Sequence, residues 1–143
     1  MLHRVGLTPS QLLPSQYHGV VDHGIGLTDI VKKRFGADAD LRRADFDADS
    51  LRALITHYQP RILAFNGKRA AQAFFGVGTG YGYQTGRDIG RTLIYVAPST
   101  SGAAHRYWNE QIWLEVALAA SAVQSGCQGS TAARIAARTD RGR

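Results

Sequence analysis

The sequence has few of the residues that build disulfide frameworks, metal cages and membrane spans. It holds one cysteine in 143 residues, Cys127, which excludes an internal disulfide and leaves no set of thiolates for a metal or iron–sulfur centre. Its five histidines lack metal-ligand spacing. No apolar run approaches the roughly 18 residues that cross a bilayer, and residues 1–6 lack the apolar core of a secretory signal. We therefore expect a cytoplasmic protein without metal, cofactor or membrane contact.

What the sequence does contain is enough apolar material for one domain and an excess of positive charge. Hydrophobic residues make up 44% of the chain, which suffices for a core at this length. Seventeen Lys and Arg against eleven Asp and Glu give a net charge of +6, which favours a polyanionic partner. Four of the arginines lie in residues 125–143, which are rich in small and polar residues and are predicted to form a solvated basic tail. The single domain is predicted over residues 1–124.

Apolar patterning indicates an α/β chain. Two short apolar runs, 61–65 and 93–97, have the length and residue types of buried strands, and Pro98 ends the second because proline cannot continue a ladder. Helical spacing or capping residues predict helices over 15–23, 50–58, 69–75 and from Asn109 to about residue 123. The apolar positions of the second of these helices are Leu51, Leu54, Ile55 and Tyr58.

The segments between these elements carry their own signals. Residues 8–11 have the form of a capping box with proline at the first helical position, which predicts a short helix there. Pro14 then breaks or restarts the helix, and Gly24 ends it. Residues 37–49, which hold five aspartates, are interpreted as an exposed connector.

A glycine-rich run opens the segment from residue 76 to residue 90. It does not meet the dinucleotide-binding fingerprint, because it follows a predicted helix and lacks a glycine where the pattern requires one. We interpret the segment as a loop in which Tyr81 and Tyr83 are candidates for base stacking.

Polar residues gather where the two predicted strands end, which is where open α/β sheets bind ligands. Residues 99–106 supply hydroxyls, a glycine and cations. Lys68 begins a helix whose macrodipole is already positive there, so we expect an anion such as phosphate beside it. Asp29 interrupts an apolar run and is interpreted either as a turn or helix cap or as a pocket residue. The adjacent cations 32–34 are either a solvated turn or a phosphate contact.

Four blocks of the sequence together resemble the mismatch-specific uracil/thymine DNA glycosylases. They are Leu-His-Arg-Val-Gly-Leu-Thr-Pro (2–9), Gly-Ile-Gly-Leu-Thr-Asp-Ile-Val (24–31), Ala-Phe-Asn-Gly-Lys (64–68) and Pro-Ser-Thr-Ser-Gly (98–102). Their order and spacing match the family, and the resemblance extends from residue 2 to about residue 120.

The resemblance implies a three-layer α/β/α sandwich around a short, mostly parallel sheet. It implies a monomeric enzyme of base-excision repair that flips uracil or thymine out of a G/U or G/T mismatch in double-stranded DNA and hydrolyses its glycosidic bond. The same resemblance assigns the base pocket to Thr28, Asp29 and Ser99. The residues it assigns to DNA contact and to the wedge that enters the duplex are Lys68, Ser101, Gly102, Ala103, Ala104, His105 and Arg106.

The sequence departs from the family at two single positions, since Ser99 stands where Asn is often found and Ala103 is smaller than the leucine common at the wedge, and it departs further in a whole motif. The family's first motif, a Gly-Ile-Asn-Pro-Gly-like turn that positions the hydrolytic water after an N-terminal strand, has no counterpart, and neither does a later base-stacking aromatic. We expect that strand to be missing from the sheet, which leaves an unpaired edge, and we take Asp29 as the catalytic candidate. Three accounts stay open: a glycosylase that has lost this motif, a non-catalytic binder of mismatched or distorted DNA, and a domain kept for a protein partner.

Overall fold

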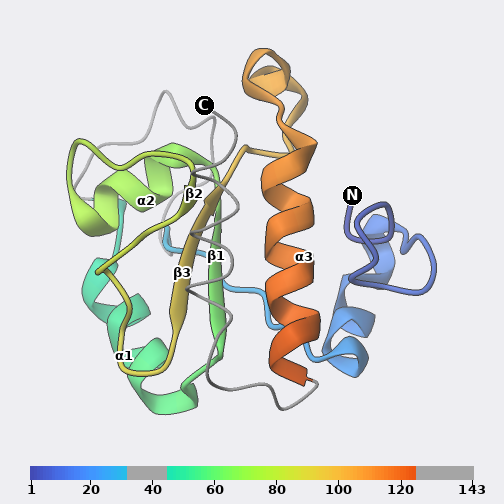
Figure 1. Cartoon of the computed structure of the whole chain (residues 1–143), viewed down its shortest axis with the longest axis horizontal. Helices are drawn as coiled ribbons and strands as arrows, with labels where there is room; N and C mark the ends of the chain where they lie inside the picture. The colour runs from blue at the N-terminus through green and yellow to red at the C-terminus, as the bar shows by residue number, and fades with distance from the viewer. Residues whose placement is uncertain (32–44, 125–143) are drawn as a thin grey trace.

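Three layers follow one another across the molecule (Figure 1). This computed structural model describes residues 1–31 and 45–124, apart from the side chains of residues 103–105, 123 and 124. Helices α1 (Ala48–Tyr58) and α2 (Lys68–Phe75) form one outer layer, a small sheet forms the middle, and helix α3 (Glu110–Gln124) forms the other outer layer. The predicted α/β class and the three-layer sandwich are confirmed.

The sheet has three strands in the order β1-β3-β2. Strand β3 (Leu93–Ala97) is central, pairs in parallel with β1 (Ile62–Asn66) along its whole length, and pairs antiparallel with the two-residue strand β2 (Gly82–Tyr83). The sheet is therefore mixed, with the parallel pair as its main part. Because β1 and β3 run in the same direction, their carboxyl ends lie at the same edge of the sheet.

Strand β3 is buried because side chains of a strand alternate between the two faces and both faces are covered. Ile94 and Val96 pack with the side chains of α1 and α2, whereas Tyr95 packs against α3. Ala97 also faces α3, where it meets Trp113. This double burial explains why the sequence 93–97 is continuously apolar, and the predicted bounds of this strand are confirmed.

Helices α1, α2 and α3 differ from their predicted bounds only at the ends. Helix α1 begins at Ala48 because the Asp47 carboxylate accepts a hydrogen bond from the Ser50 N–H at 2.9 Å, so the last residues of the predicted connector 37–49 are helical. The predicted apolar stripe is wrong at Tyr58, which is 72% exposed. Helix α3 is capped by Asn109, whose side-chain oxygen accepts from the Gln111 N–H at 3.0 Å, as predicted.

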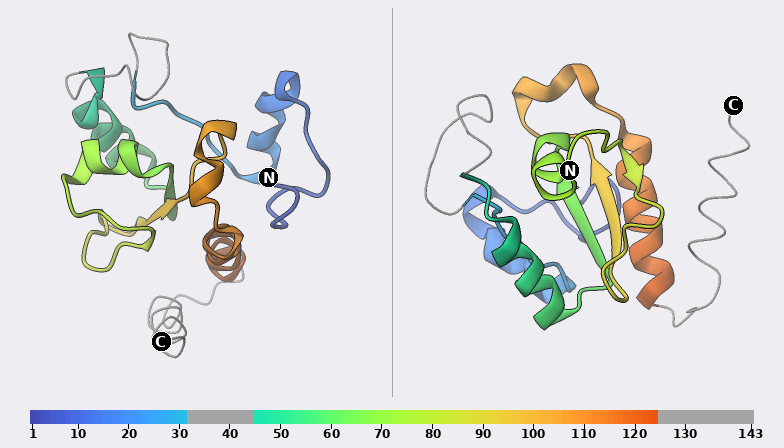
Figure 2. Two further views of the ribbon diagram at one scale, coloured as in Figure 1. Left: turned by 90° about the horizontal axis from the view of Figure 1, so that it is seen from above. Right: turned by 90° about the vertical axis from the view of Figure 1, so that its left-hand side faces the viewer.

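The N-terminal residues fold against the side of α3 away from the sheet (Figure 2). The predicted helix start at 8–11 is wrong, because the Thr8 hydroxyl donates to the Ser10 carbonyl at 2.9 Å instead of capping a turn. A 3-10 helix, η1 (Pro14–His23), begins at Pro14 and ends, as predicted, at Gly24 with φ of 71°. Val5 packs with Trp113 of α3.

The segment 76–90 is more ordered than the predicted loop. It contains β2, and an isolated bridge joins Ile89 to Thr92. The interpretations of residues 32–34, 37–44 and 125–143, Cys127 included, lie outside the described residues. In the part of the chain that the structure describes, no helix is both long and apolar enough to cross a membrane.

Tyr83 of β2 and Tyr95 of β3 make the free energy of unfolding sensitive to high pH. Burial raises the pKa of Tyr95 to about 12, and burial together with the 2.7 Å hydrogen bond that the Tyr83 hydroxyl donates to Asp88 raises the pKa of Tyr83 to about 12. A folded-state pKa above the unfolded value of about 10 gives stability that is complete below pH 10 and declines as the pH rises toward 12. We expect the unfolding midpoint in urea to fall across this window.

Tyr83→Phe tests this prediction because it leaves one of the two phenols. The decline in the urea midpoint between pH 10 and pH 12 is expected to become shallower in this variant. A decline of unchanged steepness in Tyr83→Phe, or a wild-type midpoint that is flat across the window, would contradict the assignment.

Candidate nucleic-acid interface

The carboxyl ends of β1 and β3 are joined by the side chain of Asn66. Its Nδ2 donates to the Thr100 hydroxyl at 3.0 Å, and its Oδ1 accepts from the Thr100 N–H at 2.9 Å. Both ends of one amide are therefore used to hold the loop that follows β3. This double hydrogen bond, which we call the Asn66 latch, fixes the position of residues 98–101 relative to β1.

Gly67 allows the same loop to lie close to the start of α2. Its N–H donates to the Ala97 carbonyl at 2.9 Å, and its φ of 116° lies in a region that side chains other than glycine rarely adopt. A Cβ at this position would stand 3.4 Å from the Cβ of Ser99, which is an ordinary van der Waals contact, so the backbone angle is what favours glycine. Glycine at position 67 thus allows the backbone turn that joins β1 to α2 beside Ser99.

A hydrogen bond from α3 also holds the loop. The buried indole of Trp113 donates from Nε1 to the Pro98 carbonyl at 2.9 Å. Within the loop, the Ser101 N–H donates to the Ser99 hydroxyl oxygen at 3.3 Å, and the two serine hydroxyls lie 3.2 Å apart. Ser99 is half-buried and Ser101 is exposed, so the structure places Ser99 at the base of the loop and Ser101 at its surface.

The predicted wedge is a helical turn and not an irregular loop. A 3-10 helix, η4, spans Gly102–Tyr107, because a run that opens with glycine and two alanines has no β-branched side chain to resist a tight turn. Ala103, Ala104 and His105 lie on this turn, and their side chains are outside the described part. Arg106 is exposed beside them. In Figure 1, η4 lies above the first turn of α3, at the end of the molecule toward which the carboxyl end of β3 points.

Lys68 is the first residue of α2, as the sequence predicts for a cation at this edge. Its ammonium lies 4.3 Å from the centre of the Tyr81 ring, a distance at which the ring face attracts a cation. The sequence explains a cation at the positive end of α2 by a bound anion alone. The Tyr81 ring also stabilises the Lys68 ammonium there. This contact also places Tyr81 against Lys68 and the core near α2.

A pocket of about 430 Å³ opens beside this loop. The residues that line it are Arg4, Ser99, Thr100, Ser101, Gly102 and Trp108. Ser99, Ser101 and Gly102 are residues that the sequence assigns to the site, so the structure brings these three together at one hollow. Arg4 and Trp108 are additions that sequence reasoning misses.

Thr28 and Asp29 lie elsewhere, on the segment that follows η1, and both are exposed. Neither belongs to the described residues that line the pocket at the β3 loop. Their assignment to the base pocket stays a prediction.

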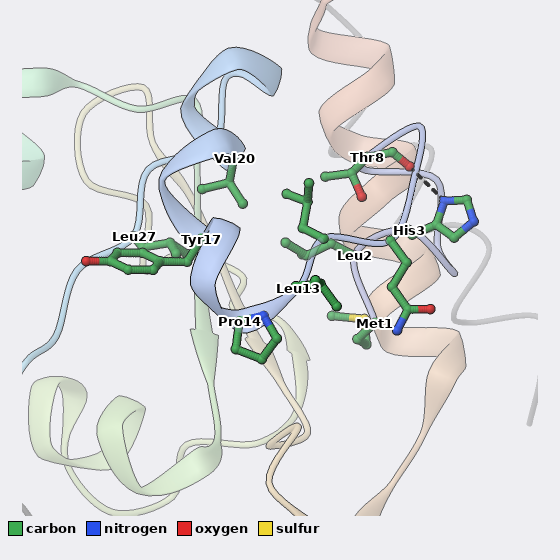
Figure 3. Close-up of a pocket in the computed structure, with 11 residues that line it drawn as sticks. Met1, Leu2, His3, Thr8, Leu13, Pro14, Tyr17, Val20 and Leu27 are labelled. Carbon is green, nitrogen blue, oxygen red and sulfur yellow. Dashed lines mark hydrogen bonds between the residues drawn. The ribbon is translucent and has the colours of Figure 1, made fainter.

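A second pocket, of about 240 Å³, lies between the first residues of the chain and η1 (Figure 3). Its walls are mainly apolar and include Leu13, Tyr17 and Val20. His3 contributes a ring nitrogen 3.2 Å from the Thr8 carbonyl oxygen. None of the described residues that line it is one the sequence assigns to the site, and in the described ranges no three His, Cys, Asp or Glu side chains gather as a metal site would require.

One comparison with known proteins bears on this geometry. A model of the uracil DNA glycosylase superfamily matches residues 1–120. The matched residues include β1, β3, the Asn66 latch, η4 and most of α3. The match ends close to residue 124, where the sequence places the domain boundary, and that boundary itself stays a prediction.

Proposed function

The chain belongs to the uracil DNA glycosylase superfamily, a family of hydrolases that act on uracil in DNA, and we propose that it removes uracil or thymine mispaired with guanine. The glycosidic bond of a base cannot be reached inside the stack, so such an enzyme must flip the base into a pocket. The observation that carries the proposal is the polar loop after β3, held to β1 by the Asn66 latch beside a pocket of about 430 Å³.

The residues of η4 suit entry into a duplex. Gly102 permits close approach, and the methyl-sized groups of Ala103 and Ala104 can slide between bases with little steric cost. The exposed cation Arg106 can meet the backbone or the guanine left without a partner. In this proposal η4 holds the space of the flipped base while Ser99 contacts the base in the pocket.

Hydrolysis passes through an oxocarbenium-like state and needs a positioned water. We assign to Asp29 the role of positioning the hydrolytic water, because a carboxylate can accept a proton from water and can stabilise a developing positive charge on the sugar. The exposure of Asp29 leaves it accessible to a bound duplex.

The position of Asp29 also favours a second candidate function. Since Asp29 does not line the pocket among the described residues, a chain with this geometry can recognise mismatched or distorted DNA without releasing a base. This second function keeps the DNA contacts of η4 and the loop and omits the hydrolytic step.

Incubation of the chain with labelled duplexes that hold one G·U, G·T or A·U pair, followed by alkali, tests both functions. Strand scission at G·U in excess of A·U is the expected result. Tighter binding to the mismatched duplex with no scission would support the second function. Equal binding to mismatched and matched duplexes with no scission would contradict both.

Asp29→Asn tests the catalytic assignment. A general base contributes about 10²- to 10⁴-fold to a rate, so we expect single-turnover uracil release to fall by about a hundredfold or more with duplex affinity unchanged. Asp22→Asn, at an exposed position on η1, is the matched control and should keep the wild-type rate. Full activity in Asp29→Asn would remove Asp29 from the mechanism.

A further inference from the structure

Arg4 and Glu110 join two parts of the chain that are 106 residues apart. The Arg4 Nη2 donates to the Glu110 Oε2 at 2.8 Å, while Nε faces Oε1 at 2.5 Å. This bidentate geometry uses one edge of the planar guanidinium, which has five N–H donors in all. The Arg4 side chain is 67% exposed, against 31% for Glu110, so most of the guanidinium side chain is open to solvent.

Among the described residues that line the pocket at the β3 loop, Arg4 is also the one that carries a charge. The hydroxyl-bearing residues Ser99, Thr100 and Ser101 line the same hollow, and so does Trp108, whose side chain is a flat indole. A guanidinium with several hydroxyls is a donor set suited to a phosphate oxygen, whereas an indole suits the carbon face of a sugar.

We propose that Arg4, together with the hydroxyls of Thr100 and Ser101, binds the phosphodiester group of the flipped nucleotide, with its deoxyribose against Trp108 and its base on Ser99 as in the proposed function. The inference rests on the proposed function, because DNA is the source of that group and η4 lies directly after the loop. Glu110 orients the guanidinium, and its negative charge offsets part of the attraction between Arg4 and phosphate.

A purely structural role of the Arg4–Glu110 pair makes a different prediction. An exposed ion pair contributes little to stability, and removing either partner destroys the same interaction. If the pair has only a structural role, Arg4→Ala and Glu110→Gln should change duplex affinity equally. A phosphate-binding role requires Arg4→Ala to weaken DNA binding while Glu110→Gln preserves or strengthens it, because that variant removes a negative charge beside the phosphate.

Duplex binding measured against salt concentration separates the two roles. For Arg4→Ala we expect affinity to fall about tenfold, as for the loss of a charge-assisted hydrogen bond, and the slope of log K against log salt to become shallower by about 0.9, as for one lost phosphate contact. Arg91→Ala removes an exposed cation at the opposite edge of the sheet and should change the slope less. Equal effects of Arg4→Ala and Glu110→Gln, or an unchanged slope in Arg4→Ala, would overturn the inference.

Inorganic phosphate supplies a second arm that does not depend on DNA or on base release. The Arg4 Nε–Hε resonance should shift saturably as phosphate is added to the wild-type chain, and the Arg91 resonance should not. Saturable shifts with an unchanged duplex salt slope would mean a site for free phosphate and would overturn the assignment to DNA. A shallower slope in Arg4→Ala together with no uracil release would support the phosphate site and contradict the proposed enzyme activity, so the two failures are distinguishable.

Discussion

A Trp113→Ala variant is expected to lose about 3–5 kcal/mol of the free energy of unfolding, the usual cost of truncating a buried tryptophan. Trp113 is 6% exposed and packs in the core with Val5, Ala97 and Ala117. Its Nε1 donates to the Pro98 carbonyl at 2.9 Å, so truncation also leaves that buried acceptor without its partner. One side chain therefore joins the N-terminal segment, α3 and the end of β3.

Urea unfolding of three variants separates packing from hydrogen bonding at this position. Trp113→Phe keeps most of the bulk and loses the donor, so it should cost about 1–3 kcal/mol. Trp108→Ala, at a partly buried residue of the same cluster, should cost less than Trp113→Ala. Equal and small losses in Trp113→Ala and Trp108→Ala would contradict the central role of Trp113.

An Asn66→Ala variant is expected to lower the rate of uracil release by about a hundredfold while the chain stays folded. The change removes both hydrogen bonds of the Asn66 latch, and a displacement of about 1 Å in a positioned group can cost about 10²-fold. Two hydrogen bonds at an exposed position contribute only about 1–3 kcal/mol to folding. The expected effect is thus larger on activity than on stability.

Substitutions at Thr100 give a graded control for the latch. Thr100→Ser keeps the hydroxyl and the backbone N–H, so its rate of uracil release should equal that of the wild type. Thr100→Val loses only the hydrogen bond to the hydroxyl, so its rate should lie between those of the wild type and Asn66→Ala. If the chain is a non-catalytic binder, the same order should be seen in the ratio of mismatched to matched duplex affinity. Wild-type behaviour of Asn66→Ala in both measurements would show that the latch does not position the loop.

The main secondary structure could be predicted because its signals are local. Strand β3 is buried on both faces and is therefore continuously apolar, and Pro98 ends it at a residue that the sequence identifies. The N-terminal helix start is wrong because Thr8 has the right residue type for a cap but uses its hydroxyl for a local turn. Strand β2 is missed because it has only two residues, one of them a glycine, which is too short for a periodic pattern.

The candidate site is predictable in its position and less so in its contacts. The rule that ligands bind at the carboxyl ends of strands directs attention to Ser99 and Lys68, and both lie at that edge. The partners of the Asn66 latch are 34 residues apart and those of the Arg4–Glu110 pair are 106 apart. Neither contact can therefore be predicted from local sequence patterns. The ring of Tyr81 over Lys68 is hidden for the same reason.

We propose that the edge of the sheet where β1 and β3 end is the surface that binds DNA. Backbone amide chemical shifts recorded while a G·U duplex is added to the chain locate the DNA-binding surface residue by residue. We expect the largest shifts on residues 66–68 and 99–106, with little change around Arg91 and Thr92 at the opposite edge. Shifts concentrated at that opposite edge or on the residues that line the pocket beside η1, with residues 66–68 and 99–106 unperturbed, would contradict it.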